Sequence, residues 1–263
     1  MQQFLLSILE TLSTQILVLF GLFFVLGFIL TTLQEQTQKN YYRSIGWKGI
    51  LWTAWIGTPV HELSHLFFAL LFRHRIVSLK LFSPNQETGE LGEVQHSYTR
   101  GSIYQVAGNF FIGVAPLIGG SCALAFLAYL VIPHGGDVQQ TLLVNPTSLR
   151  QILQNATTLL GQIFTPLNLA SPLFWLCLYL SFCVSSHMAP SKVDRRSMWH
   201  GFGWLLVALI LFNIVGAILN YNATQLVFQA AGYLSILTAL FLYAIVVSLC
   251  HFLLSLIFAA LKS

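Results

Sequence analysis

Charge is what this sequence lacks most. Asp, Glu, Lys and Arg make up 8% of the 263 residues, whereas apolar residues make up 56%. A water-soluble domain of this size carries far more charge on its surface, so the composition excludes a soluble globular fold. Several uninterrupted apolar stretches are long enough to cross a bilayer as helices. The sequence therefore predicts an all-α polytopic membrane protein whose single membrane domain covers residues 1–263.

Three further absences narrow the class of protein. The four cysteines all fall in apolar stretches and none has CxxC spacing, which argues against disulfides and cysteine zinc sites. The net charge of +4 is spread over loops without a basic stripe of interleaved aromatic residues, so we expect no nucleic-acid partner. No Lys or Arg precedes the first apolar run, and no small-residue cleavage site follows it. We therefore expect a retained span there rather than a signal peptide.

We expect six transmembrane helices, at about residues 12–33, 49–72, 103–132, 173–188, 202–219 and 226–261. The last is longer than a bilayer requires, so it should tilt, bend or project. Eight Lys and Arg residues fall on one side of this arrangement and four on the other. The positive-inside rule then predicts that both termini are cytoplasmic and that the more basic side contacts membrane lipid. The eight are Arg73, Arg75, Lys80, Arg100, Lys192, Arg195, Arg196 and Lys262.

The second expected span contains the pentad His61-Glu62-Leu63-Ser64-His65, in which Glu62 is the only charge between residues 49 and 72. Two histidines four residues apart lie on one face of a helix, so both imidazoles can bind one metal ion. Glu62 is then placed to take a proton from water on that metal. Burying such a group in a membrane is costly, which favours a chemical role. The alternative is a polar trio satisfied by neighbouring helices without a metal.

A catalytic zinc site usually has three protein ligands, and the sequence restricts the third. No Glu follows Glu93, which excludes an arrangement with a downstream helical Glu. Phe68 and Leu71 exclude the HExxHxxGxxH arrangement. Beyond Glu93 only Asp137 and Asp194 are acidic, and Asp137 is predicted on the opposite side of the membrane.

Asp194 is therefore the expected third ligand, with His187 as its rival. Pro190 lies between them and breaks a helix, so a residue beyond it can return toward the metal. Asp194 could instead form a capping box with Ser191 at the start of a helix. His187 could instead have a polar or packing role at a helix end.

Two other polar positions lie close to this group in the expected spans. Asn109 is a polar side chain at membrane depth, and we consider it a catalytic candidate because its amide could donate to a tetrahedral oxyanion. It could equally bond across to a neighbouring helix. Thr58 and Pro59 resemble an N-cap and a first-turn proline, which predicts a helix break just before the pentad. The alternative is a plain proline kink.

Residues 77–82 and, more loosely, 89–98 alternate apolar and polar side chains, and Ser83-Pro84-Asn85 begins a turn between them. This pattern predicts a small cytoplasmic β-hairpin after the second span. The hairpin could be a structured loop only, or its edge could pair with an extended substrate.

These motifs together resemble the site-2 protease class of intramembrane zinc metalloproteases, the M50-type peptidases. The shared features are the pentad in a span, a following span with Gly, Asn and Pro, and Asp194 after a proline two spans later. The resemblance implies a catalytic core at 49–201 and two accessory spans at 202–263. It implies a hydrolase that binds zinc through His61, His65 and Asp194 and cleaves a transmembrane protein substrate near the cytoplasmic face.

The sequence departs from the family at two points. Arg195 follows Asp194, where the family commonly has Gly. No PDZ-like insertion is present, so substrate gating must come from the spans, the hairpin or a regulatory membrane partner. Two other functions fit the pentad: a non-catalytic membrane scaffold with a residual metal site, and an ion-binding transporter. A transporter should show paired, symmetric broken helices, and the sequence has one such motif without a symmetric mate.

Overall fold

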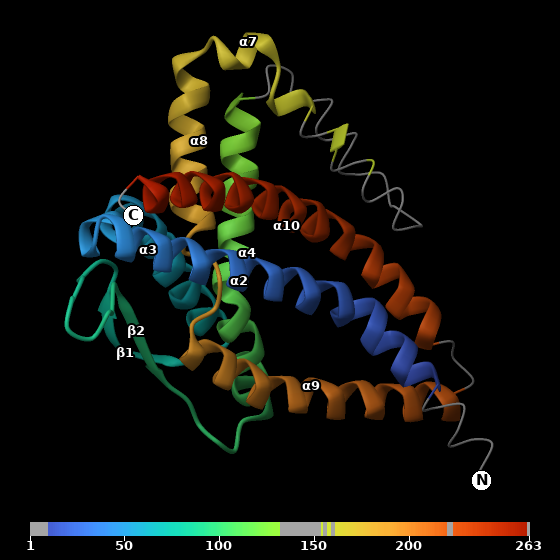
Figure 1. Cartoon of the computed structure of the whole chain (residues 1–263). Helices are drawn as coiled ribbons and strands as arrows, with labels where there is room; N and C mark the ends of the chain where they lie inside the picture. The colour runs from blue at the N-terminus through green and yellow to red at the C-terminus, as the bar shows by residue number, and fades with distance from the viewer. Residues whose placement is uncertain (1–9, 132–153, 155–156, 159–160, 220–222, 262–263) are drawn as a thin grey trace.

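The computed structural model describes residues 10–131, 154, 157–158, 161–219 and 223–261 (Figure 1). These residues form helices and their connections, apart from one antiparallel hairpin, so the predicted helical fold with a small hairpin is confirmed. The elements are η1 (Leu17–Gly21), α2 (Leu22–Ser44), α3 (Trp47–Leu71), β1 (Arg75–Lys80), β2 (Glu93–Ser97), α4 (Ile103–Val131), α7 (Pro166–Leu169), α8 (Pro172–Ser185), α9 (Lys192–Ile218) and α10 (Ala223–Ala260).

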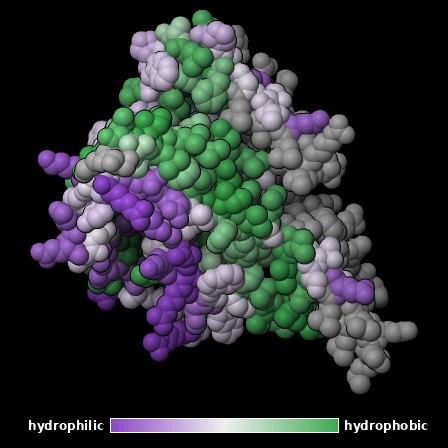
Figure 2. All heavy atoms as spheres, viewed as in Figure 1, coloured by the Kyte–Doolittle hydropathy of each residue, from purple (hydrophilic) through white to green (hydrophobic). Residues whose placement is uncertain are grey.

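Four helices in the described part of the chain are long and apolar enough to cross a membrane. They are Glu10–Ser44, Ile103–Val131, Lys192–Ile218 and Leu240–Ala260. Large apolar side chains lie exposed along all four, as contact with lipid requires. Figure 2 shows apolar residues across the middle of the molecule and hydrophilic residues gathered toward the hairpin side.

The expected count of six spans is not confirmed, although every expected segment contains a helix. α8 has 14 residues, about 21 Å, which is short of a hydrocarbon core of about 30 Å. α3 has 25 residues, but the polar side chains of its pentad reduce its hydropathy. α10 has 38 residues, so the prediction of an unusually long last helix is confirmed.

Two expected helix boundaries are wrong. α3 runs unbroken from Trp47 to Leu71 with Pro59 inside it, so Thr58 is not an N-cap and the alternative of a proline within a continuous helix holds. α9 begins at Lys192 and not near residue 202, because the Ser191 side chain and the Asp194 carboxylate cap its first turn. The early start puts Asp194 on a rigid helix. The sequence around residues 149–153 has moderate helical periodicity, and this segment lies outside the described residues.

Glycines let the helices that carry the pentad and Asp194 pack closely on their neighbours. α4 meets α9 at Gly113, where a Cβ would come within 2.6 Å of the Asp194 carbonyl oxygen. α3 meets the end of α8 at Gly57, where a Cβ would come within 2.5 Å of His187 Cδ2. Figure 1 shows the resulting arrangement, with α4 beside α8, α2 beside α10, and α9 leaving from the foot of α4.

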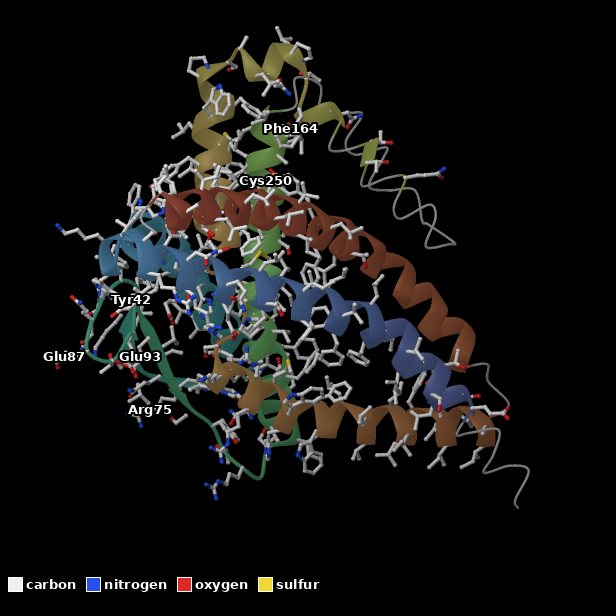
Figure 3. The ribbon with its side chains drawn as sticks, in the orientation of Figure 1. Tyr42, Arg75, Glu87, Glu93, Phe164 and Cys250 are labelled. Atoms are coloured by element: carbon white, nitrogen blue, oxygen red, sulfur yellow. The ribbon has the colours of Figure 1, made fainter. Side chains whose placement is uncertain are left out.

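The hairpin packs on α3 beside the pentad. β1 and β2 are antiparallel, with Arg75 opposite Ser97 and a register shift between Ile76 and Ser78. Arg75 and Glu93 lie on this hairpin and Glu87 on its turn, at one edge of the molecule (Figure 3). The predicted hairpin is therefore present: β1 begins two residues earlier than the alternating sequence suggests, and β2 is shorter than it suggests.

Candidate metal centre

His61 and His65 project from one face of α3, and the first turn of α9 brings Asp194 to the same place. The Nε2 atoms of the two histidines are 3.1 Å apart. The Asp194 carboxylate oxygens are 3.6 Å from His61 Nε2 and 3.3 Å from His65 Nε2. Ligand atoms of a tetrahedral zinc ion with bonds of about 2.0–2.1 Å lie about 3.3 Å from one another. The 3.6 Å distance is to Oδ2 and the 3.3 Å distance to Oδ1, and one ligand atom from each of the three residues lies within 4.8 Å of the other two, so these residues could hold a metal ion.

Backbone carbonyls fix which nitrogen of each histidine faces the cluster. His61 Nδ1 lies 2.6 Å from the carbonyl oxygen of His187, and His65 Nδ1 lies 2.8 Å from the carbonyl oxygen of Ile112. A carbonyl only accepts, so both Nδ1 atoms carry the proton. A neutral imidazole has one N–H, which leaves a lone pair on each Nε2. Metal-binding histidines commonly have this arrangement, in which the second nitrogen donates to a carbonyl.

Three acceptor groups thus converge, and none of them can donate a hydrogen bond to another. A proton on one imidazole would satisfy one pair of atoms at a time, whereas a divalent cation satisfies all three together. The group is well shielded: the side chains of His61, His65 and Asp194 are 14%, 7% and 16% exposed. The donor set of two imidazoles and one carboxylate suits zinc and leaves a fourth position open.

Asp194 combines the two roles between which the sequence left a choice. One carboxylate oxygen accepts a hydrogen bond from the Ser191 backbone N–H at 2.7 Å, and the Ser191 hydroxyl accepts from the Asp194 backbone N–H at 3.2 Å. The same carboxylate faces both histidines. Arg195 is directed elsewhere, to the carbonyl oxygen of Pro190 at 3.2 Å and to Glu35 at 4.0 Å. The capping box therefore orients the carboxylate toward the histidines.

Glu62 is buried beside this group, with 7% of its surface exposed. Its carboxylate is within electrostatic reach of His61, His65 and Asp194. The backbone of Gly92, just before β2, lies directly over it, because a Cβ there would come within 2.9 Å of Glu62 Cγ. The hairpin thus shields the one carboxylate that is next to the cluster but outside it.

His187 and Asn109 lie around the cluster and are not members of it. The His187 ring contacts the Thr53 hydroxyl at 3.1 Å, and only its backbone carbonyl reaches His61. Asn109 accepts a hydrogen bond from the Ser197 hydroxyl of α9 at 3.4 Å, so the expected cross-helix contact is present. Its amide nitrogen is buried and has no partner among the described residues. That nitrogen is a free hydrogen-bond donor and lies one helical turn before Ile112, whose carbonyl oxygen accepts from His65.

A second histidine pair lies at the foot of the hairpin. His74 Nε2 donates to the carbonyl oxygen of Gln105 at 2.9 Å, and its Nδ1 lies 2.9 Å from Nδ1 of His96. Burial lowers the pKa of His74. Burial, and then the neighbouring His74, lower the pKa of His96 to about 4. Both rings are therefore neutral at pH 7. No sequence pattern pairs these two histidines, since the whole hairpin separates them.

No protein-family model, curated protein or solved structure matches this chain.

Proposed function

We propose that this protein is a zinc-dependent intramembrane endopeptidase. The observation that carries the proposal is the convergence of two imidazole lone pairs and a carboxylate beside the buried Glu62. A residual structural site does not require a separate carboxylate next to the ligands, whereas hydrolysis does. The proposal therefore gives a role to all three ionisable side chains of the pentad.

The chain supplies a role for each of these groups. His61, His65 and Asp194 would hold zinc, which would supply a water of lowered pKa and a polarised carbonyl oxygen. Glu62 accepts a proton from the water that attacks the peptide carbonyl carbon, and returns it to the amine that departs when the C–N bond breaks. Asn109, with its unpartnered buried N–H, donates to the oxygen that gains negative charge. The carbonyl oxygens of His187 and Ile112 keep the imidazoles in the required tautomer.

The substrate class follows from the position of the pentad. His65 lies two helical turns before Arg73, about 12 Å along the axis. We propose that α3 and the short α8 are also embedded beside the four long apolar helices, which gives six spans and makes the more basic side cytoplasmic. The substrate is then a membrane-spanning protein cut in the cytoplasmic half of the bilayer. Its peptide must leave the helical conformation there, because a helical peptide bond is shielded from attack.

The test is cleavage of a co-expressed single-span protein, with its fragments mapped by mass spectrometry. Glu62→Gln should abolish cleavage while the purified protein still binds about one zinc per chain. Glu87→Gln makes the same change on the exposed hairpin turn and should leave cleavage intact. Cleavage that persists in Glu62→Gln overturns the mechanism. A cut that maps to the outer half of the bilayer overturns the proposed orientation.

A further inference from the structure

The connection between α8 and α9 supports both sides of the candidate metal centre. It begins at Ser186, includes the His187 carbonyl that accepts from His61, and leads to Ser191, which caps Asp194. A movement of this connection would therefore turn the His61 imidazole. It would also shift the carboxylate on the other side of the cluster.

Three helices hold the connection in place. Thr53 of α3 contacts the His187 ring at 3.1 Å. Gln34 of α2 accepts a hydrogen bond from the Ala189 backbone N–H at 3.0 Å. His251 of α10 contacts the Ser186 hydroxyl through Nδ1 at 2.5 Å. The last contact comes from a helix outside the part of the chain in which the sequence placed the catalytic core.

The His251 ring is buried among aromatic side chains beside this contact. Its ring is 1% exposed and is stacked on Phe182, with ring centres 5.1 Å apart and planes at 13°. Tyr41 covers it from α2 at 5.2 Å. Its Nε2 has no hydrogen-bond partner among the described residues. A buried polar side chain in an apolar helix is costly, and Ser186 is the partner that offsets this cost.

We infer that His251 is a positioning residue for the metal centre: through Ser186 it holds the His187 carbonyl that orients the imidazole of His61. The inference rests on the proposed function only in requiring that His61 binds a metal. Partners that orient a metal ligand typically change affinity by about 10–100-fold when they are removed. The accessory helix α10 thus contributes to metal affinity without contacting the metal.

The experiment measures zinc affinity and the visible absorption of the Co²⁺-loaded protein, which reports ligand geometry. His251→Phe keeps an aromatic ring on Phe182 but removes the hydrogen bond. It should lower zinc affinity about 10–100-fold and alter the Co²⁺ spectrum. His251→Asn places a polar atom near the position of Nδ1 and should restore both. Ser186→Ala should match His251→Phe, and the double variant should be no worse than either single variant.

Ser255→Ala is the matched control. Ser255 is buried one turn further along α10 and accepts a hydrogen bond from Asn40 of α2 at 3.0 Å, so it also joins two helices. Its loss should leave the zinc affinity unchanged. The inference is wrong if His251→Phe binds zinc as tightly as wild type, or if Ser255→Ala weakens binding equally. Wild-type protein that binds no zinc would instead contradict the proposed function itself.

Discussion

Substitutions at and near Asp194 can separate helix capping from metal binding, because its carboxylate both caps α9 and faces two histidines. Asp194→Asn keeps the shape of the side chain and an oxygen that can accept from the Ser191 N–H. It removes the negative charge that a zinc site of two neutral imidazoles needs. We expect zinc affinity to fall by more than about 100-fold, since even outer partners of a ligand are worth 10–100-fold.

The complementary change is Ser191→Ala, which removes the hydroxyl that accepts from the Asp194 N–H at 3.2 Å. Loss of an N-cap costs about 1 kcal/mol, or a fall in Tm of about 2–4 °C for a chain of this size. We expect Ser191→Ala to lower Tm by about that amount and to retain zinc. Asp194→Asn should lose zinc and keep a Tm close to that of the wild type.

The assay is zinc content after dialysis of the detergent-purified protein against graded chelator concentrations, with thermal unfolding of the same samples. Unfolding is compared after complete removal of metal, so that bound zinc does not contribute to Tm. The account of Asp194 is wrong if Asp194→Asn retains zinc like wild type. It is also wrong if Ser191→Ala loses zinc to the same extent.

Two further predictions follow from the histidines outside the cluster. His187→Ala should lower zinc affinity by no more than about 10–100-fold in the same dialysis assay, because its ring only anchors the connection through Thr53 and the carbonyl that orients His61 is backbone; a loss larger than that in Asp194→Asn would make His187 the third ligand. The folded-state pKa values of His74 and His96 are below the ordinary histidine value. The neutral pair therefore stabilises the hairpin above about pH 6.5, and this stabilisation is lost as the pH falls toward about 4. Amide hydrogen exchange in β1 and β2, corrected for the intrinsic exchange rate, should accelerate over that pH range. The acceleration should be smaller in His96→Asn, because Asn keeps a polar atom near the position of Nδ1 but does not titrate. Equal acceleration in the two proteins would contradict this prediction.

The part of the site that is local in the chain could be predicted from the sequence. His61 and His65 share a face because any helix places residues four apart on one side. Elimination points to Asp194, since few acidic residues follow the hairpin. The sequence leaves its capping role and its place in the cluster as alternatives, because a sequence pattern does not show that one carboxylate can do both.

The rest depends on tertiary contacts that leave no signal in the sequence. The acceptors of the two Nδ1 protons are backbone carbonyls, which every residue has, so nothing singles out Ile112. Gly92 covers Glu62 only because the hairpin folds back on α3. His251 and Ser186 are 65 residues apart. The count of six spans is not confirmed for a related reason: hydropathy finds apolar stretches, but α8 ends after 14 residues.

The central claim is that His61, His65 and Asp194 hold one zinc ion next to Glu62. The most direct test is an anomalous difference map at the zinc absorption edge from crystals of the metal-replete protein. The account predicts one peak per chain, about 2.0–2.2 Å from Nε2 of both histidines and from a carboxylate oxygen of Asp194. A zinc-replete protein with no peak there, or with a peak whose ligands do not include Asp194, would contradict it.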